Sequence, residues 1–356
     1  MSKRRFGVVG LGGVADRIHI PACLAVEDID LVAGCDPSES SRQRVAGKFK
    51  LPEVYSSFDE MLEKSKLHGV IIGTPPDSHF EIASRAIEAG LHVFCEKPFM
   101  STLEQADEII ELARSNRRAL RVNNQYRYMS FYRETKRRLD AGEFGRAFYL
   151  QFWQQMFHPP SSESNWRKNL TKYVLYEFGT HALDLACFLF GSLPSSIRVL
   201  APKARAEFDA DVLLHATLEF PEERIAVFSF NRISHAPEKY LECRLDCNDA
   251  SVRVSLGGVA RLGVEWSKHA GRPVLKAGFV KGGEARVERG GKTKTFCSSA
   301  RGEFATATAE HLRVFVGEMG AAQPPLESAI HAREVLRLVF EGYRSAESGE
   351  VVRLPR

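Results

Sequence analysis

The tetrapeptide Cys95-Glu96-Lys97-Pro98 follows a short apolar run and carries the first group suited to chemistry. Pro98 disfavours the helical region for the residue before it, so Lys97 is expected to be extended, with its side chain held out from the end of the run. An ammonium group beside a reacting hydroxyl can stabilise developing alkoxide charge through a charge-assisted hydrogen bond. A lone lysine before proline is usually a surface residue, so Lys97 becomes a catalytic candidate only through its neighbours.

A second candidate group lies at 177–184, where an apolar stretch carries Glu177, His181 and Asp184. Residues at i, i+4 and i+7 lie on one face of a helix. A histidine beside a carboxylate on such a face has the parts of an oriented general base, because imidazole exchanges protons near neutral pH. A helix cap with a hydrogen-bonded core histidine explains these three residues equally well when they are taken alone.

A glycine-rich turn, Gly10-Leu11-Gly12-Gly13-Val14-Ala15, directly follows the first β-rich run. In a dinucleotide-binding turn, Gly10 would form the sharp bend and Gly12 would let the backbone approach a pyrophosphate. Ala15 would permit close packing of the following helix on the strand. The amino end of that helix would then present unpaired N–H groups to the phosphates.

Asp36 ends the next β-rich run about 20 residues after the turn, at the spacing of an acid that binds the adenosine ribose. Its carboxylate would accept hydrogen bonds from the ribose hydroxyls and repel a 2′-phosphate. We therefore expect NAD as the cofactor. NADP stays an alternative, because Arg42 and Arg44 follow closely.

Two further segments, Thr74–His79 and Glu96–Lys97, each follow a β-rich run. Ligands of open α/β sheets bind outside the carboxyl ends of the strands, so both segments are expected on the same edge as the glycine turn. The residues expected to bind the cofactor are Gly10, Gly12, Gly13, Val14, Ala15, Asp36, Thr74, Pro75, His79, Glu96 and Lys97.

The elements that must position these groups alternate along the first third of the chain. The expected strands are 5–10, 30–36, 69–73, 92–95 and 120–123, and the expected helices are 14–26, 39–49, 58–64, 79–89 and 103–115. Strands that alternate with helices are typical of a parallel sheet with right-handed crossovers. We predict an α/β fold that begins with a doubly wound Rossmann domain at residues 1–124.

Beyond residue 124 the pattern changes to longer apolar and polar alternations, which predict antiparallel strands with one buried face. These alternations lie at 147–152, 213–220, 225–230 and 241–245. We expect a polar loop at 157–171, hairpins within 257–291, and helices at 303–319 and 326–345. The sequence thus predicts a C-terminal α+β domain at 125–356 with a large, mostly antiparallel sheet, which supplies the substrate site and the general base.

Together these motifs resemble the Gfo/Idh/MocA oxidoreductases, the family of glucose–fructose oxidoreductase and the inositol dehydrogenases. The resemblance is carried by the glycine turn with Asp36, Thr-Pro-Pro-x-x-His at 74–79, Glu-Lys-Pro at 96–98 and Gly-x-His-x-x-Asp at 179–184. Ser-Ala-Glu-Ser-Gly at 345–349, before a short strand, extends the resemblance to nearly the whole chain.

The resemblance implies roles for individual residues. Lys97 would hydrogen-bond the reacting hydroxyl, His181 would take or give its proton, and Asp184 would contact or orient the substrate. Arg167 follows Trp166 in a segment that often precedes the histidine helix, and it would reach an anionic or hydroxylated part of the substrate. The other residues expected to bind the substrate are Glu177 and Tyr126.

Two departures from the family pattern lie at the expected substrate pocket. Many polyol dehydrogenases of the family have Asp four residues before the histidine, where this chain has Glu177. The glycine-rich run often found before that position is replaced by Lys172-Tyr173-Val174-Leu175. Both departures concern the identity of the substrate rather than the fold.

The expected reaction is reversible hydride transfer between nicotinamide and a carbinol or ketone carbon of a sugar, polyol or sugar derivative. One alternative is transient oxidation with return of the hydride, which gives net glycoside cleavage, elimination or epimerisation. Another is a ligand-sensing regulator on the same fold, which would be marked by loss of Lys97 or His181. The resemblance also implies a homodimer or homotetramer formed through the second sheet.

Composition argues against several other classes. The 49 Lys and Arg against 45 Asp and Glu give a net charge of only +4, dispersed along the chain, unlike a nucleic-acid-binding surface. No apolar run approaches the ~20 residues of a membrane span, and the basic N-terminus lacks the apolar core of a signal peptide. We expect a cytoplasmic protein without nucleic-acid or membrane partners.

The 7 cysteines form an odd and scattered set, as expected of reduced thiols in core positions. Cys243 and Cys247 are the one close pair, and neither a second cysteine pair nor a matching histidine pair accompanies them. A zinc site needs four ligands at suitable spacing, so no metal is expected.

Overall fold

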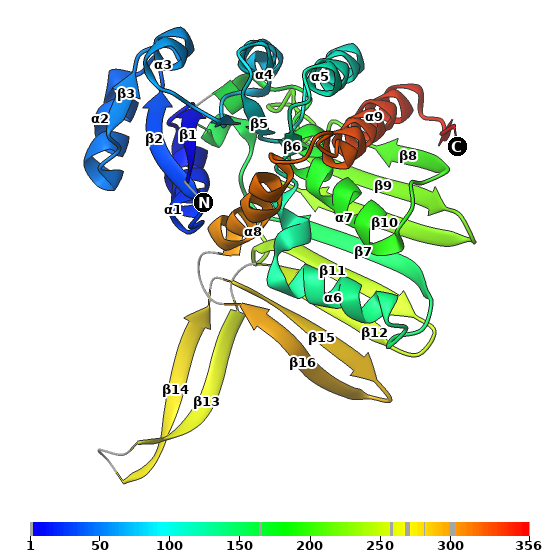
Figure 1. Ribbon diagram of the computed structural model, residues 1–356. Coiled ribbons are helices and arrows are strands. Elements are labelled where there is room, and N and C mark those ends of the chain that lie inside the picture. The colour runs from blue at the N-terminus through cyan, green and yellow to red at the C-terminus, as the bar shows by residue number, and fades with distance from the viewer. Residues whose placement is uncertain are drawn as a thin grey trace. The chain divides into compact units, whose positions relative to one another are not determined.

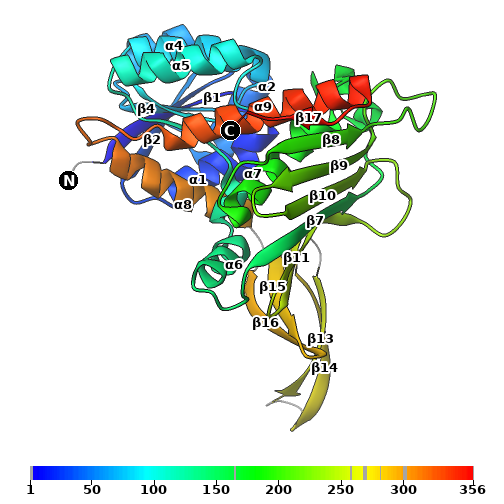
Figure 2. The same ribbon diagram turned by 90° about the vertical axis from the view of Figure 1, so that its right-hand side faces the viewer.

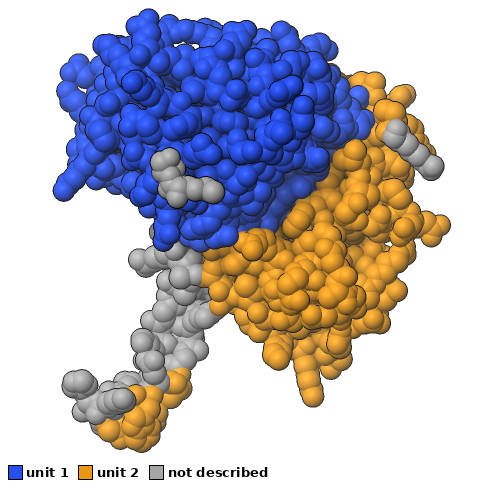
Figure 3. Space-filling model, in the orientation of Figure 1, with its two compact units in different colours: residues 1–128, 175–185, 304–341 blue, residues 129–174, 186–303, 342–356 orange. Residues whose placement is uncertain are grey.

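The computed structural model describes residues 3–163, 166–256, 259–267, 271–280, 282–299 and 303–355 (Figure 1). The chain divides into two compact units, each assembled from segments far apart in the sequence. Unit 1 comprises Met1–Tyr128, Leu175–Leu185 and Phe304–Glu341, and unit 2 comprises Met129–Val174, Ala186–Glu303 and Gly342–Arg356 (Figure 3). The chain first passes from unit 1 to unit 2 after Tyr128, close to the expected domain boundary at 124/125. The sequence pattern does not indicate the later passages between the units.

The sheet of unit 1 has six strands in the order β3-β2-β1-β4-β5-β6, all paired in parallel. The strands are Arg4–Val9 (β1), Ile29–Cys35 (β2), Glu53–Tyr55 (β3), Gly69–Ile72 (β4), His92–Cys95 (β5) and Leu120–Val122 (β6). The expected doubly wound sheet is confirmed. The expectation of five strands was wrong, because the sheet has a sixth strand, β3. Its three half-buried residues are too few to form a recognisable sequence pattern.

Helices follow the strands of unit 1 as the sequence predicts. The first runs as a π-helix at Ala15–His19 (η1) and an α-helix at Ile20–Leu24 (α1); the others are Glu39–Phe49 (α2), Phe58–Lys64 (α3), His79–Glu88 (α4) and Leu103–Ser115 (α5). The hydroxyls of Ser38, Ser57 and Thr102 cap α2, α3 and α5 by accepting the backbone N–H three residues on, at 3.4, 3.2 and 3.2 Å. Such caps satisfy amide groups that have no partner within the helix, and they fix where each helix begins.

Both faces of the parallel sheet are buried under helices. Phe6 of β1 packs on one face with Phe315 of helix α8 (Glu303–Glu318), and Val9 lies in the cluster on the other face with Leu336 of helix α9 (Glu327–Ser348). Figure 2 shows α4 and α5 along one face and α1 and α8 along the other. The sequence pattern places α8 and α9 in the C-terminal domain, but most of both helices belongs to unit 1, because their apolar faces complete its two helical layers.

The main sheet of unit 2 has nine strands in the order β16-β15-β12-β11-β7-β10-β9-β8-β17 (Figure 2). The strands are Ala147–Gln155 (β7), Ser196–Leu200 (β8), Leu213–Phe220 (β9), Arg224–Asn231 (β10), Lys239–Cys247 (β11), Ser251–Leu256 (β12), Gly283–Arg289 (β15), Lys292–Ser299 (β16) and Val352–Arg353 (β17). Among the described pairs, only β7 and β10 run parallel, so the expected mostly antiparallel sheet is confirmed.

The remaining elements of unit 2 include the hairpins expected within 257–291. Val259–Ser267 (β13) and Arg272–Val280 (β14) form a separate two-stranded sheet, and helix α6 (Ser130–Asp140) packs against β12, β15 and β16. The expected polar loop at 157–171 contains two short 3-10 turns, Pro160–Ser162 (η4) and Trp166–Asn169 (η5). No helix in the described part of the chain is long and apolar enough to cross a membrane.

The packing of α8 on the Rossmann sheet can be tested through Phe315, which is fully buried and lies 6.1 Å from the Phe6 ring and 5.5 Å from the Phe94 ring, measured between centroids. Phe315→Ala should lower the free energy of unfolding by about 3–5 kcal/mol, because it leaves a cavity in the core. Val314→Ala, at a 40% exposed position on the same helix, should cost less than about 1 kcal/mol. Equal losses in denaturant titrations of the two variants would contradict this packing.

Candidate active site

The glycine turn after β1 has the shape that a dinucleotide requires. Gly10 adopts φ +86°, and a Cβ there would lie 2.8 Å from Thr74 Cγ2 and 3.0 Å from the carbonyl carbon of Gly73, so no larger residue fits. A Cβ on Gly12 would meet no atom of the described residues within 4 Å. The turn therefore lets its backbone come close to a pyrophosphate, and the residues present fit the group that the sequence motif implies.

Asp36 is fixed beside this turn. Its Oδ2 accepts a hydrogen bond from Leu11 N at 2.8 Å and its Oδ1 accepts one from Ser38 N at 2.8 Å. The carboxylate thus stands at the end of β2, at the position from which an acid binds ribose hydroxyls. Arg42 Nη1 donates to the Asp36 carbonyl at 2.7 Å and Arg44 Nη2 to the Leu11 carbonyl at 2.6 Å, so two cations also border the turn.

His79 joins the loops that follow β4 and β5. Its Nδ1 lies 3.1 Å from the carbonyl oxygens of both Pro98 and Phe99, and its Nε2 lies 3.0 Å from the carbonyl oxygen of Thr74. The ring is fully buried, and burial lowers its pKa. These contacts hold the two loops together, while the predicted contact of His79 with the cofactor stays a prediction.

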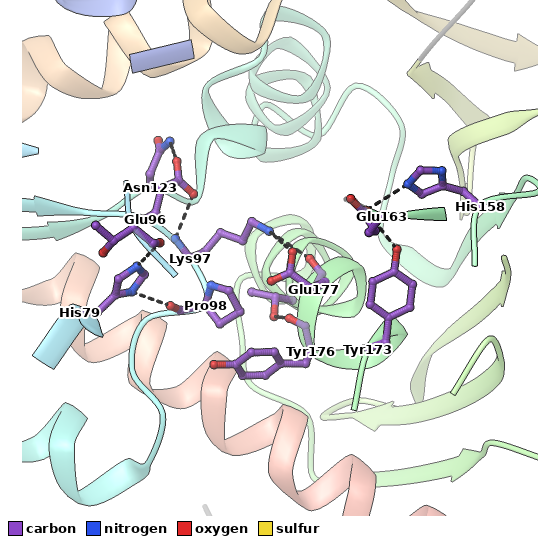
Figure 4. A network of polar contacts seen from close by, with 12 residues as sticks. His79, Glu96, Lys97, Pro98, Asn123, His158, Glu163, Tyr173, Tyr176 and Glu177 are labelled. Carbon is purple, nitrogen blue, oxygen red and sulfur yellow. Dashed lines mark hydrogen bonds and ion pairs between the residues drawn. The ribbon is translucent and has the colours of Figure 1, made fainter. Parts of the chain in front are cut away.

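Glu96 is a buried carboxylate that accepts two hydrogen bonds and lies close to a buried histidine. Asn123 Nδ2 donates to Oε1 at 2.6 Å and the Lys97 amide donates to Oε2 at 3.1 Å (Figure 4). His19 Nε2 lies 3.0 Å from Oε1. Burial alone would raise the pKa of Glu96, but the close contact with His19, the charge of Lys97 and the hydrogen bond from Asn123 outweigh it and lower the pKa. The side chain therefore ties the first helix, β5 and β6 together, and the sequence analysis missed His19 and Asn123.

Lys97 extends from the end of β5 toward Glu177 (Figure 4). Its Nζ donates to the Glu177 carbonyl at 3.1 Å and lies 3.9 Å from Glu177 Oε2. The side chain of Lys97 is 12% exposed and that of Glu177 only 2%. Two residues that are 80 positions apart in the sequence are thus brought together in unit 1, and the catalytic role of Lys97 stays a prediction.

The histidine segment is not the regular helix that the spacing predicts. Residues Val174–Gly179 form a π-helix (η6), and the α-helix Thr180–Phe190 (α7) follows. Because a π-helix bonds each residue to the fifth along rather than the fourth, Glu177 and His181 do not meet as i, i+4 partners. Among the described residues no hydrogen bond joins His181 to Glu177 or Asp184, so the structure favours the second of the two interpretations of this segment, in which the histidine is not paired with a carboxylate.

His181 is held instead by an aromatic ring. Its imidazole stacks on Tyr126, with ring centroids 3.9 Å apart and an interplanar angle of 7°. Burial disfavours the charged imidazolium and the Lys97 ammonium repels it, so the pKa of His181 lies well below its ordinary value. The ring is therefore neutral over the physiological range and able to accept a proton.

Asp184 is 1% exposed and is fully engaged by protein groups. Arg127 Nε lies 2.8 Å from both carboxylate oxygens, and His331 Nε2 lies 3.0 Å from Oδ1. Burial would raise the pKa of Asp184, but the charge of Arg127 and the contact with His331 lower it. The predicted contact of Asp184 with substrate stays a prediction; Arg127 and His331 were missed because no local pattern links them to the histidine helix.

Arg167 lies in a different unit from the other candidates. It belongs to η5 in unit 2, and its guanidinium stands over the Trp166 ring, 4.5 Å from the centroid. Lys97, Tyr126, Glu177 and His181 belong to unit 1. A role for Arg167 in binding substrate stays a prediction.

The fold and the site define a dinucleotide-binding protein of the Rossmann type, and comparison with known families makes the class specific. The family model described as "Oxidoreductase family, NAD-binding Rossmann fold" matches residues 4–124, and the model of the GFO/IDH/MocA C-terminal domain matches residues 132–253. The chain belongs to the GFO/IDH/MocA family of NAD-binding oxidoreductases.

Individual relatives agree with this assignment. The chain is 30% identical to the uncharacterized oxidoreductase YdgJ of Escherichia coli over 62% of this chain and 63% of that protein. It is 32% identical to the D-glucoside 3-dehydrogenase of Escherichia coli over 53% of this chain and 55% of that protein. The crystal structure of myo-inositol 2-dehydrogenase from Lactobacillus plantarum has a similar fold, with a TM-score of 0.80, 20% identity and coverage of 99% and 100% of the two chains.

Asp36 should set the preference between the two nicotinamide cofactors. Asp36→Ala should weaken NAD binding and lower the ratio of the NADP to the NAD dissociation constant by about tenfold, because it removes both a ribose partner and a negative charge. Asp30→Ala, an exposed acid at the other end of β2, should leave the ratio unchanged. Fluorescence titration with both cofactors measures the ratio, and tighter binding of NADP than of NAD by the unmodified protein would contradict the assignment.

The protonation of His181 should follow its surroundings. NMR titration of the His181 ring should show no protonation between pH 8 and about 6.5, since the pKa is lowered below that ordinary value. Lys97→Met should raise the pKa by removing the repelling charge, while burial still keeps it below about 6.5. Lys66→Met, at an exposed lysine, serves as the control. A midpoint at or above pH 6.5 in the unmodified protein would overturn this description of the site.

Proposed function

We propose that this protein catalyses reversible NAD-dependent oxidation of a carbinol carbon in a sugar, polyol or sugar derivative. The observation that carries the proposal is the largely buried side chain of Lys97, which follows β5 and whose charge, together with burial, lowers the pKa of the His181 imidazole. The names of two similar proteins, D-glucoside 3-dehydrogenase and myo-inositol 2-dehydrogenase, support hydroxylated ring compounds as the substrate class.

Lys97 would stabilise the negative charge that develops on the substrate oxygen. An ammonium has three donors, and the Glu177 carbonyl takes one of them in this structure. The remaining donors can reach a substrate hydroxyl without loss of that tether. In a buried site such a charge-assisted bond is stronger than it would be in water, so it lowers the barrier mainly where alkoxide character is greatest.

His181 would take the hydroxyl proton in the oxidation direction and return it in the reduction direction. Its low pKa keeps the ring in the accepting form, and it also makes the ring a weak base. A weak base suffices where Lys97 lowers the cost of the alkoxide, because the proton then leaves a more acidic hydroxyl. Bound NAD would supply the hydride acceptor at nicotinamide C4.

The outcome of turnover separates this proposal from the alternative in which the hydride returns. Net oxidation accumulates reduced cofactor in proportion to product, whereas transient oxidation leaves NAD unreduced after complete conversion. An absorbance screen of sugars, inositols, sugar acids and keto-sugars, with product analysis, distinguishes the two outcomes. Assembly as a homodimer or homotetramer and a cytoplasmic location remain expectations that accompany the proposal.

Substitution of the two central residues should separate chemistry from cofactor binding. Lys97→Ala and His181→Ala should change the NAD dissociation constant by less than about tenfold, or 1.4 kcal/mol, because neither side chain is needed to hold the adenosine half. Turnover should fall on the order of 10²-fold to 10⁴-fold, since both groups act mainly in the transition state. Lys66→Ala is the matched control. Full turnover in both variants would refute the mechanism, and absence of turnover in the unmodified protein with every substrate class would favour a ligand-sensing role.

A further inference from the structure

We propose that Tyr126 is a positioning residue that orients the His181 ring, as the carboxylate does in a histidine–carboxylate pair. This inference rests on the proposed function, since it assigns to Tyr126 an effect on proton transfer by His181. It differs from the expected role of Tyr126 in binding substrate. A substrate contact would need the phenol hydroxyl of Tyr126, whereas orientation of His181 needs only its ring.

The contact between the two rings is close and nearly parallel. The centroids lie 3.9 Å apart at an interplanar angle of 7°, and Tyr126 and His181 are only 2% and 7% exposed. Phe304 packs against Tyr126, with centroids 5.8 Å apart at 62°. The Tyr126 ring, which itself packs against Phe304, restricts rotation of the His181 imidazole about its terminal torsion angle. In the absence of such a contact this angle has a broad distribution.

The same short element holds the histidine helix at a second point. Tyr126 and Arg127 are neighbours in the 3-10 turn Gln125–Tyr128 (η3) that follows β6. Tyr126 stacks on His181, and Arg127 binds the carboxylate of Asp184 one turn further along α7. The turn therefore fixes both the rotation and the position of the helix segment that carries the base.

Stacking leaves the chemistry of the ring edge intact. A carboxylate partner would occupy one imidazole nitrogen and favour the charged ring, whereas a face contact leaves both nitrogens at the edge. The charged groups nearby are Lys97 after β5, Glu177 on η6, and Asp184 on α7 with its partner Arg127 on η3. The titratable His331 on α9 also contacts Asp184. Only Lys97 joins burial in lowering the pKa of His181, so the neutral ring persists.

The chain contains a matched pair that serves as a control. Tyr128, two residues along the same turn, stacks on His311 with centroids 4.1 Å apart at 13°. His311 is buried like His181 but lies beside Arg121, whose Nη1 is 3.0 Å from His311 Nε2. Removal of either tyrosine ring deletes a tyrosine–histidine stack, but only one of the two stacks contains the proposed base.

The experiment compares Tyr126→Leu, Tyr126→Phe and Tyr128→Leu. Tyr126→Leu should lower kcat on the order of 10-fold to 100-fold while the NAD dissociation constant stays within about threefold, because the base is misaligned and the cofactor site is untouched. Its acid limb of activity should move to higher pH, since the imidazole becomes better solvated. Tyr126→Phe keeps the ring and should retain kcat and the pH profile. Tyr128→Leu should lower the melting temperature about as much as Tyr126→Leu does, while kcat and the pH profile stay as in the unmodified protein.

Two results would overturn the inference. Unchanged kcat and pH profile in Tyr126→Leu would show that the stack does not orient the base. Equal losses in Tyr126→Phe and Tyr126→Leu would show that the hydroxyl matters, as a substrate contact would. If Tyr126→Leu does not fold, Phe304→Leu, which removes the ring behind Tyr126, should give the same change in smaller measure, and its absence would also count against the stack.

The NMR titration of His181 separates this inference from the proposed function. In Tyr126→Leu the pKa of His181 should rise toward its ordinary value, and in Tyr126→Phe it should stay where it is in the unmodified protein. This readout needs no turnover. A shifted pKa in a protein that turns over no substrate would support the positioning role of Tyr126 and contradict the proposed enzymatic function. An unshifted pKa in an active enzyme would support the function and contradict the positioning role.

Discussion

The site depends on the contacts that stabilise the buried negative charge of Glu96. A carboxylate removed from water is costly unless polar groups surround it. Here Asn123 after β6 and the Lys97 amide donate hydrogen bonds to it, and His19 of the helix after the glycine turn lies within ion-pair distance. The cofactor turn and the proposed catalytic lysine are thereby bound to one group. Lys97 Nζ in turn donates to the Glu177 carbonyl in the histidine segment. The positions of Lys97 and of this segment therefore depend on the groups that hold the Glu96 carboxylate in place.

Lys97 has two electrostatic effects that support each other. Its ammonium can stabilise an alkoxide, and its charge adds to the effect of burial in lowering the pKa of His181. A stronger base would need a carboxylate partner, and the acids nearby are engaged elsewhere: Glu177 faces Lys97, and Asp184 faces Arg127 and His331. In the proposed reaction, proton transfer would rely on a more acidic substrate hydroxyl rather than on a more basic histidine.

The local parts of this structure could be predicted from the sequence, and the distant ones could not. Strand periodicity, the glycine turn and the residues at strand ends are short-range patterns, so the parallel sheet and the neighbourhood of Lys97 were accessible. The π-helix at 174–179 has no sequence pattern of its own, and it separated Glu177 from His181. His331 meets Asp184 from 147 residues away, and periodicity cannot tell which sheet α8 and α9 will cover.

The interleaving of the chain limits how the protein can be divided. Helix α7 passes from unit 1 to unit 2 after Leu185, and α9 does so after Glu341, so neither unit is a continuous stretch of sequence. A fragment that ends near residue 124 would lack α8 and α9 and would leave apolar surface on both sides of its sheet open to water. Recombination between relatives at a single crossover near residue 124 would therefore separate the N-terminal segment of unit 1 from residues 175–185 and 304–341, so chimeras that keep the core of unit 1 intact must inherit all three segments together.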